Sequence, residues 1–139
     1  MTTAAPLSIA PTVAASGFEA DDLLNTLETL TDSQLDALDF GVIGFDADGI
    51  VRRYNAFESG AAGLSSQRVL GHPLFTVVAP CMNNYLVAQR FEDAVGASQT
   101  LDETVGYVLT LRMRPVKVGL RLLSSPAAGM RYVLVKRSA

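Results

Sequence analysis

The sequence predicts an α+β domain in which a five-stranded antiparallel sheet carries helical connectors on one face and an N-terminal helical cap. Three observations lead to this class: helical spacing of apolar residues near the start, a hairpin signal around residue 48, and strand-like runs after residue 101. With 139 residues and 49% hydrophobic content, the chain fits a single domain. We expect a disordered tail over 1–16, the cap over 17–40 and the core of the domain over 41–139.

The N-terminal cap begins where the composition changes. Residues 1–16 consist mainly of Ala, Pro, Ser and Thr, which offer too little apolar surface to offset the entropy of ordering. Two short helices are expected after them, with Asp21 and Asp22 in the first turn of the first helix, where the helix dipole favours acids. One of residues 31–33 should cap the second helix. The apolar residues at helical spacing are Phe18, Leu23, Leu24, Leu27, Leu30, Leu35 and Leu38.

The sheet is predicted from a hairpin and three later runs. The segment FGVIGFDADGIVRRYN places the turn dipeptide Asp48–Gly49 between β-prone stretches. Connectors broken by Gly and Ser follow, and helical spacing over Asn83–Val95 predicts a helix across the sheet. The last strands are expected in ETVGYVLTLRM, VKVGLRLLSS and GMRYVLVKR. In the middle run, alternate residues over Val116–Leu122 are apolar, which predicts one apolar and one mainly polar face.

The composition argues against several classes of function. The net charge of -3 and the pI near 5.0 provide no basic face for a nucleic acid. No apolar run approaches the ~20 residues of a membrane span, and the first residues lack the positive charge of a signal peptide. A single cysteine and a single histidine suit neither an internal disulfide nor a metal site. We expect a cytoplasmic, non-enzymatic protein without nucleic-acid, membrane or metal partners, either monomeric or weakly dimeric.

Charge is distributed unevenly along the chain. Every charged residue up to Asp48 is acidic, whereas the C-terminal third is basic. Either the acidic N-terminal segment docks on a basic sheet or the two faces are solvated independently, and the sequence leaves both open. The basic residues concerned are Arg112, Arg114, Lys117, Arg121, Arg131, Lys136 and Arg137.

Few residues are candidates for chemistry. Cys81 follows Pro80 and precedes the predicted helix, which could favour a thiolate, although a lone cysteine in an apolar stretch is more often a small buried hydrophobe. Tyr54 and Glu58 face one pocket if the first ends a strand and the second begins a helical turn, but Glu58 is also compatible with an exposed acid. His72 has no second ligand near it, so we expect a surface or turn histidine.

Four segments together resemble the photoactive yellow protein family. They are LDALDFGVIGFDADGIVRRYNAFE, VLGHPLFTVVAPC, MRPVKV and VLVKR, and the similarity runs from about Phe18 to Arg137. The spacing between YNAxE and APC is specific, because PAS domains in general are not expected to have it. The resemblance implies a PAS-like fold and a blue-light photoreceptor.

The resemblance also implies a chromophore and its site. p-Coumaric acid (4-hydroxycinnamic acid) would be bound as a thioester to Cys81, with the Cys81 backbone N–H on the thioester carbonyl and with Tyr54 and a protonated Glu58 donating hydrogen bonds to the phenolate. After trans–cis photoisomerisation, proton transfer from Glu58 would leave a buried charge, and partial unfolding of the cap would form the signalling state for an unknown downstream partner. The implied pocket residues are Ala62, Leu64, Phe75, Val78, Pro80, Tyr107, Leu109, Leu111 and Met113.

The chain departs from the family pattern in this pocket. Ala62 stands where archetypal members have a threonine, Leu64 where they have an arginine over the chromophore, and Leu109 and Leu111 where they have aromatic residues. Met113 matches the methionine that speeds thermal recovery. Because Ala62 and Leu64 lack the polar groups that surround the chromophore in archetypal members, we expect a less uniformly ionised chromophore. Its neutral-phenol form should give a shorter-wavelength band that grows as the pH falls.

Two alternative functions remain open at this point. A PAS module could bind another small ligand non-covalently, or it could be a protein-interaction module without a ligand. Only the photoreceptor predicts an acyl group on Cys81 after exposure to activated hydroxycinnamate.

Overall fold

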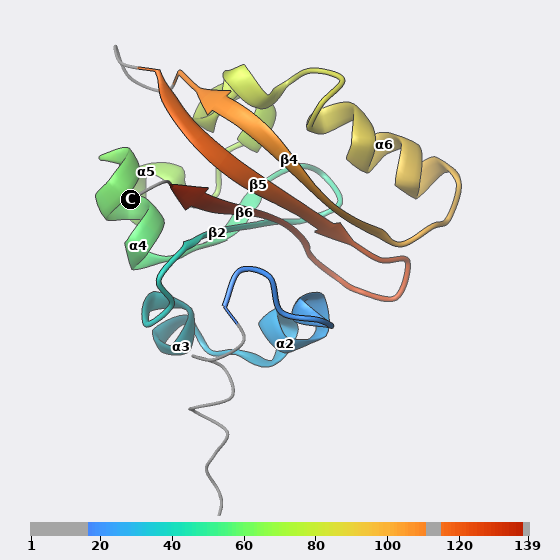
Figure 1. The fold of residues 1–139 in the computed structure, drawn as a ribbon, viewed down its shortest axis with the longest axis horizontal. Helices are drawn as coiled ribbons and strands as arrows, with labels where there is room; N and C mark the ends of the chain where they lie inside the picture. Colours follow the sequence, from blue (N-terminus) through green and yellow to red (C-terminus); the bar gives the residue numbers. More distant parts are fainter. Residues whose placement is uncertain (1–16, 111–114, 138–139) are drawn as a thin grey trace, which may run out of the picture.

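Five antiparallel strands form one sheet, in the spatial order β3-β2-β6-β5-β4 (Figure 1). The strands are β2 (Gly41–Phe45), β3 (Val51–Tyr54), β4 (Leu101–Leu109), β5 (Val116–Ser124) and β6 (Arg131–Arg137). The computed structural model describes residues 17–110 and 115–137, so the predicted tail lies outside the described residues. The predicted α+β class and its sheet are confirmed.

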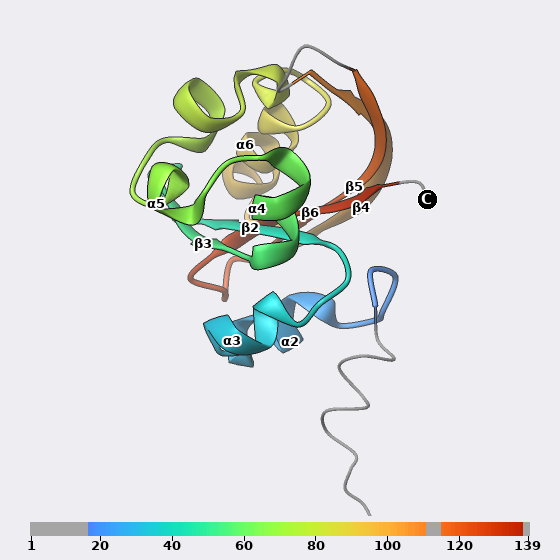
Figure 2. The same ribbon diagram turned by 90° about the vertical axis from the view of Figure 1, so that its left-hand side faces the viewer.

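Helical segments cover both faces of the sheet (Figure 2). The cap contains α2 (Leu23–Thr29) and α3 (Asp32–Asp36), and it lies on the face opposite the connectors. The connectors between β3 and β4 are α4 (Ala56–Ala62), α5 (Ser66–Val69), the π-helical turn η1 (Leu74–Val78), the 3-10 turn η2 (Pro80–Met82) and α6 (Ala88–Gly96).

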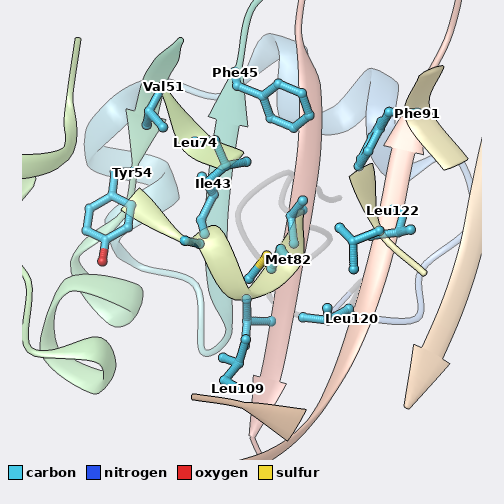
Figure 3. Packing of buried hydrophobic residues seen from close by; sticks show 14 of the residues in the cluster. Ile43, Phe45, Val51, Tyr54, Leu74, Met82, Phe91, Leu109, Leu120 and Leu122 are labelled. Carbon is cyan, nitrogen blue, oxygen red and sulfur yellow. The ribbon is translucent and has the colours of Figure 1, made fainter. Parts of the chain in front are cut away.

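Each face of the sheet has its own hydrophobic core. On the connector face, Phe91 of α6 packs edge-to-face against Phe45 of β2, with 5.0 Å between the ring centroids (Figure 3). On the other face, Leu27 of the cap is fully buried in a cluster that includes Leu123 of β5. The alternation on β5 indicates a sheet with one covered face, but this prediction is wrong for the C-terminal half of the strand, where the cap also covers the second face and buries both Leu123 and Arg121.

The first cap helix starts later than its apolar spacing suggests. Asp22 has a left-handed backbone with φ of 56°, so α2 begins at Leu23, and Asp21 and Asp22 precede the helix instead of forming its first turn. The second helix begins as predicted within 31–33. Thr31 caps it, because its hydroxyl accepts a hydrogen bond from the Gln34 backbone N–H and the Gln34 side chain accepts one from the Thr31 N–H.

The connecting helix is also shorter than predicted. It begins at Ala88 instead of Asn83, because the Asn84 side chain accepts hydrogen bonds from the backbone N–H groups of Leu86 and Val87 and holds a turn there. Tyr85, which lies inside the predicted helix, precedes the observed one and is 84% exposed.

The cap docks on the sheet, which answers the question left open by the charge pattern. Arg121 of β5 donates hydrogen bonds to the carbonyl oxygens of Phe18 and Ala20, at 2.9 and 2.7 Å. Lys136 approaches the Glu19 carboxylate at 4.0 Å, but both side chains are exposed and such pairs contribute little. Basic residues of the sheet therefore bind backbone oxygens of the N-terminal segment more closely than its acidic side chains.

Candidate functional site

Cys81 lies on the wall of a cavity on the connector face. It is the middle residue of η2 and is half-buried. The cavity has a volume of about 660 Å³, which is within the range of small-molecule sites. Its lining residues are Leu64, Arg68, Val69, Val77, Val78, Pro80, Cys81 and Thr110.

The backbone at Cys81 is held by two side chains. The Tyr107 hydroxyl from β4 donates a hydrogen bond to the Cys81 carbonyl oxygen, and the Asn84 side-chain amide donates another at 3.1 Å. Asn84 therefore holds the cysteine turn and the following turn together. Because α6 starts only at Ala88, the helical N-terminus that was expected to favour a thiolate lies farther along the chain.

Glu58 is placed in the interior by the start of α4. Asn55 caps this helix, and its side-chain oxygen accepts hydrogen bonds from the backbone N–H groups of Glu58 at 3.1 Å and Val42 at 2.9 Å. Because Glu58 is in the first turn, its side chain lies against β2, and the carboxyl is buried with 1% exposure. This burial excludes the alternative of an ordinary exposed acid.

The Glu58 carboxylate packs against the backbone of β2 and pairs with a side chain from the neighbouring strand β6. A Cβ atom at Gly41 would be only 2.0 Å from Glu58 Oε1, so the carboxylate occupies space that any other residue would fill. Arg137, the last residue of β6, binds the carboxylate with both ends of its guanidinium, at 2.7 Å for Nη1–Oε1 and 3.1 Å for Nη2–Oε2. This bidentate geometry is the strongest form of an arginine–carboxylate contact.

Burial shifts the proton affinity of both predicted phenolate partners. Desolvation raises the pKa of Glu58 above its usual range, and the hydrogen bonds and charge of Arg137 oppose that shift. Tyr54 ends β3 at the margin of the connector-face core (Figure 3). Burial, followed by the charge of Glu58, raises the pKa of the Tyr54 phenol well above its usual value. Burial therefore favours the protonated form of both groups, whereas Arg137 favours the ionised form of Glu58.

The remaining predicted pocket residues divide into three groups. Leu64, Val78 and Pro80 line the cavity beside Cys81. A second group belongs to the hydrophobic interior without appearing on the cavity wall: Ala62, Phe75, Tyr107 and Leu109. Leu111 and Met113 lie outside the described residues.

Four residues of the site were missed by the sequence-based prediction: Gly41, Asn55, Asn84 and Arg137. A signal existed for Arg137, because strand alternation in VLVKR puts it on the same face as Val135. The same alternation puts Lys136 on the cap face, where it lies over the Phe18 ring at 5.9 Å from its centroid. The contact between Gly41 and Glu58 had no local signal.

The structure also places the single histidine. His72 is exposed, and its carbonyl oxygen accepts a hydrogen bond from the Val51 N–H in a turn, as predicted. Over residues 17–110 and 115–137, no helix has the length and apolar character needed to cross a membrane. In the same part of the chain, no three His, Cys, Asp or Glu side chains gather in a way that could hold a metal ion.

Comparison with known proteins identifies relatives that span most of the chain. It is 35% identical over 120 residues to the photoactive yellow protein of Halochromatium salexigens, covering 86% of this chain and 95% of the relative. The photoactive yellow protein of Rhodothalassium salexigens is 33% identical with the same coverage. No family model matches the chain.

Solved structures agree with this assignment. The photoactive yellow protein domain of the sensor histidine kinase Ppr from Rhodospirillum centenum aligns with a TM-score of 0.75 at 33% identity, covering 82% of this chain and 99% of that domain. The PAS domain of the Cronobacter turicensis quorum-sensing receptor RpfR aligns with a TM-score of 0.56 at 15% identity, covering 73% of this chain and 95% of that domain, which supports the PAS fold alone. The chain is therefore a PAS-fold member of the photoactive yellow protein family.

Proposed function

We propose that this protein is a blue-light photoreceptor that carries p-coumaric acid as a thioester on Cys81. The observation that carries the proposal is the position of Cys81 on the wall of the 660 Å³ cavity. Tyr54 is buried in the core of the same face and Glu58 is buried in the first turn of α4, although neither lines this cavity. Leucine, valine and proline side chains form much of the cavity wall, and Arg68 lines it from an exposed position. These residues fit an aromatic acyl group.

Three residues would hold the group. The Cys81 sulfur forms the thioester, and the Cys81 backbone N–H donates to its carbonyl oxygen. Tyr54 and protonated Glu58 would donate hydrogen bonds to the phenolate. Burial raises the pKa of the Tyr54 phenol and of the Glu58 carboxyl, which helps each group to keep the proton that it donates. When bound, the group supplies absorption of blue light and a double bond that isomerises.

The signal arises from a change of charge at Glu58. In the dark its carboxyl keeps a proton, and after illumination the carboxyl gives it up and becomes a buried anion. The cap is the element that this change would release, because it is a separate N-terminal segment that is docked on the sheet by its own apolar cluster and by side-chain hydrogen bonds such as those of Arg121 to Phe18 and Ala20. The output is a change of shape and not a catalysed reaction.

Intact-mass measurement tests this function. A thioester donor of 4-hydroxycinnamate is added to the full chain, and the Cys81 sulfur attacks the acyl carbon while the donor thiol leaves with a proton. We expect the mass of one acyl group on the wild type and none on Cys81→Ala, together with a blue-absorbing band that bleaches in light. A chain that gains no acyl group, or gains one without a light-sensitive band, would contradict the proposal.

A further inference from the structure

The partner of Glu58 in the structure is an arginine from the opposite end of the chain. Two parallel hydrogen bonds join the Glu58 carboxylate to Arg137, which is 79 positions later in the sequence. The two side chains differ in burial: that of Glu58 is 1% exposed and that of Arg137 is 17% exposed. Arg137 can therefore turn toward water from this position, whereas Glu58 stays in the interior.

The other surroundings of Glu58 contribute no second cation among the described residues. From β2, Gly41 contributes no side chain, and from β3 Tyr54 contributes a neutral phenol. From the cap, Asp36 of α3 lies at the start of α4, where its carboxylate accepts a hydrogen bond from the Ala56 N–H. Among the described groups around Glu58, Arg137 is therefore the one whose positive charge stabilises the ionised carboxylate.

A carboxylate in this ion pair cannot serve as a donor to a phenolate. Both of its oxygens accept hydrogen bonds from Arg137, and an ionised carboxylate has no proton to give. A second anion placed beside it would also be repelled. A phenolate and the Glu58–Arg137 pair therefore exclude one another.

We propose that Arg137 is a positioning residue that holds Glu58 as a carboxylate in the ligand-free protein, and that loading of the cavity exchanges Arg137 for a proton on Glu58. The first half concerns the ligand-free chain alone. The second half rests on the proposed function, because it requires a phenolate in the cavity. Arg137 thereby sets the pH range in which Glu58 is ready to act as a donor.

Infrared titration of the ligand-free full chain tests the first half. The C=O stretch of a protonated, buried carboxyl is followed against pH in wild type, Arg137→Gln and Arg137→Lys, and its assignment is checked in Arg137→Gln/Glu58→Gln. We expect the midpoint to shift to higher pH in Arg137→Gln. The shift should be smaller in Arg137→Lys, because the ammonium keeps the positive charge but cannot form the two parallel hydrogen bonds of the guanidinium. The band should be lost in the double variant.

Lys136→Gln is the matched control for this titration. It removes the same charge from the adjacent position of β6, but its side chain faces the cap. We expect its Glu58 midpoint to equal that of wild type. Equal midpoints in wild type and Arg137→Gln would overturn the inference. If Arg137→Gln does not fold, judged by circular dichroism, an unchanged midpoint in Arg137→Lys would overturn it instead.

Proton counting during loading tests the second half. Wild type and Arg137→Gln are acylated with the same hydroxycinnamoyl thioester in weakly buffered solution at neutral pH, so that the proton balance of acylation itself is common to both. We expect wild type to take up an additional proton for each acylated Cys81, because its Glu58 starts ionised. Equal proton counts would overturn the exchange, whereas absence of acylation would contradict the proposed function and leave the infrared result unaffected.

Discussion

The side-chain oxygen of Asn55 accepts a hydrogen bond from the backbone N–H of Glu58 at 3.1 Å, so a fully buried asparagine sets the position of the acid. The Asn55 amide also donates to two carbonyl oxygens, at 2.9 Å to Leu35 and 3.0 Å to Phe40. One side chain therefore connects the cap, the start of β2 and helix α4.

Replacing Asn55 should destabilise the whole domain. Asn55→Ala leaves the N–H groups of Val42 and Glu58 and two carbonyl oxygens without these partners in the interior, so we expect a loss of about 2–4 kcal/mol in the free energy of unfolding. Urea denaturation measures it. Asn25→Ala is the control, because Asn25 makes an exposed hydrogen bond to Asp22 and its loss should cost less than about 0.5 kcal/mol. Equal losses in the two variants would contradict this role of Asn55.

A methyl group at Gly41 should displace the Glu58 carboxylate. The Cβ of Gly41→Ala would lie 2.0 Å from Glu58 Oε1, so the carboxylate has to move and its contacts with Arg137 weaken. We expect a loss of about 1–3 kcal/mol in urea denaturation, as for other overpacked sites. Gly106→Ala, at an unobstructed strand glycine, should change stability by less than about 0.5 kcal/mol, so similar values for the two variants would argue against steric contact.

The stability of the ligand-free protein should fall as the pH rises above the ordinary range of glutamate. Because the folded-state pKa of Glu58 is raised from 4.5, there is a window above pH 4.5 in which the carboxyl is protonated in the folded chain and ionised in the unfolded chain. The free energy of unfolding therefore decreases through that window. Glu58→Gln should flatten this part of the profile in urea titrations at successive pH values, and an unchanged slope would show that another group is responsible.

Alkaline pH should loosen the cap through Tyr132. Its hydroxyl donates to Glu28 of α2 and accepts from Arg53, both at 2.9 Å, and burial raises the pKa of the phenol from 10.0 to about 12. Between these values the phenol is ionised only in the unfolded chain, so stability is lost as the pH rises from 10.0 to about 12. Tyr132→Phe should reduce that slope and speed hydrogen exchange in α2 at neutral pH. Tyr54→Phe is the control, because Tyr54 lies on the connector face and its loss should leave exchange in α2 unchanged.

The spectrum of the loaded protein should depend on pH. Neither Ala62, which is buried, nor Leu64, which lines the cavity, offers a polar group to a phenolate. We expect a shorter-wavelength, neutral-phenol band that grows as the pH falls, and a smaller one in Leu64→Arg, whose guanidinium favours the anion. Absorption spectra across pH provide the measurement. A single band that stays in place down to acidic pH would contradict the expectation.

The sequence by itself determined the local features of this protein. Asp48–Gly49 forms the β2–β3 turn because Gly49 adopts a φ of 81° that favours glycine, and the Asp46 carboxylate accepts from the N–H groups of Asp48 and Ile50. Strand alternation and the spacing of apolar residues likewise depend on near neighbours, so the five strands were predictable. The motif around Cys81 was also recognisable from consecutive residues.

Only the tertiary structure decided which distant residues share a site. The Glu58 carboxylate has as its partner Arg137 because β6 lies next to β2 in the middle of the sheet, and strand order is a property of the whole fold. Whether Arg121 faces water or the cap likewise depends on a segment that docks from 103 positions away. Burial, and with it the pKa of Glu58, follows from such long-range packing, whereas turns and strands follow from the backbone preferences of adjacent residues.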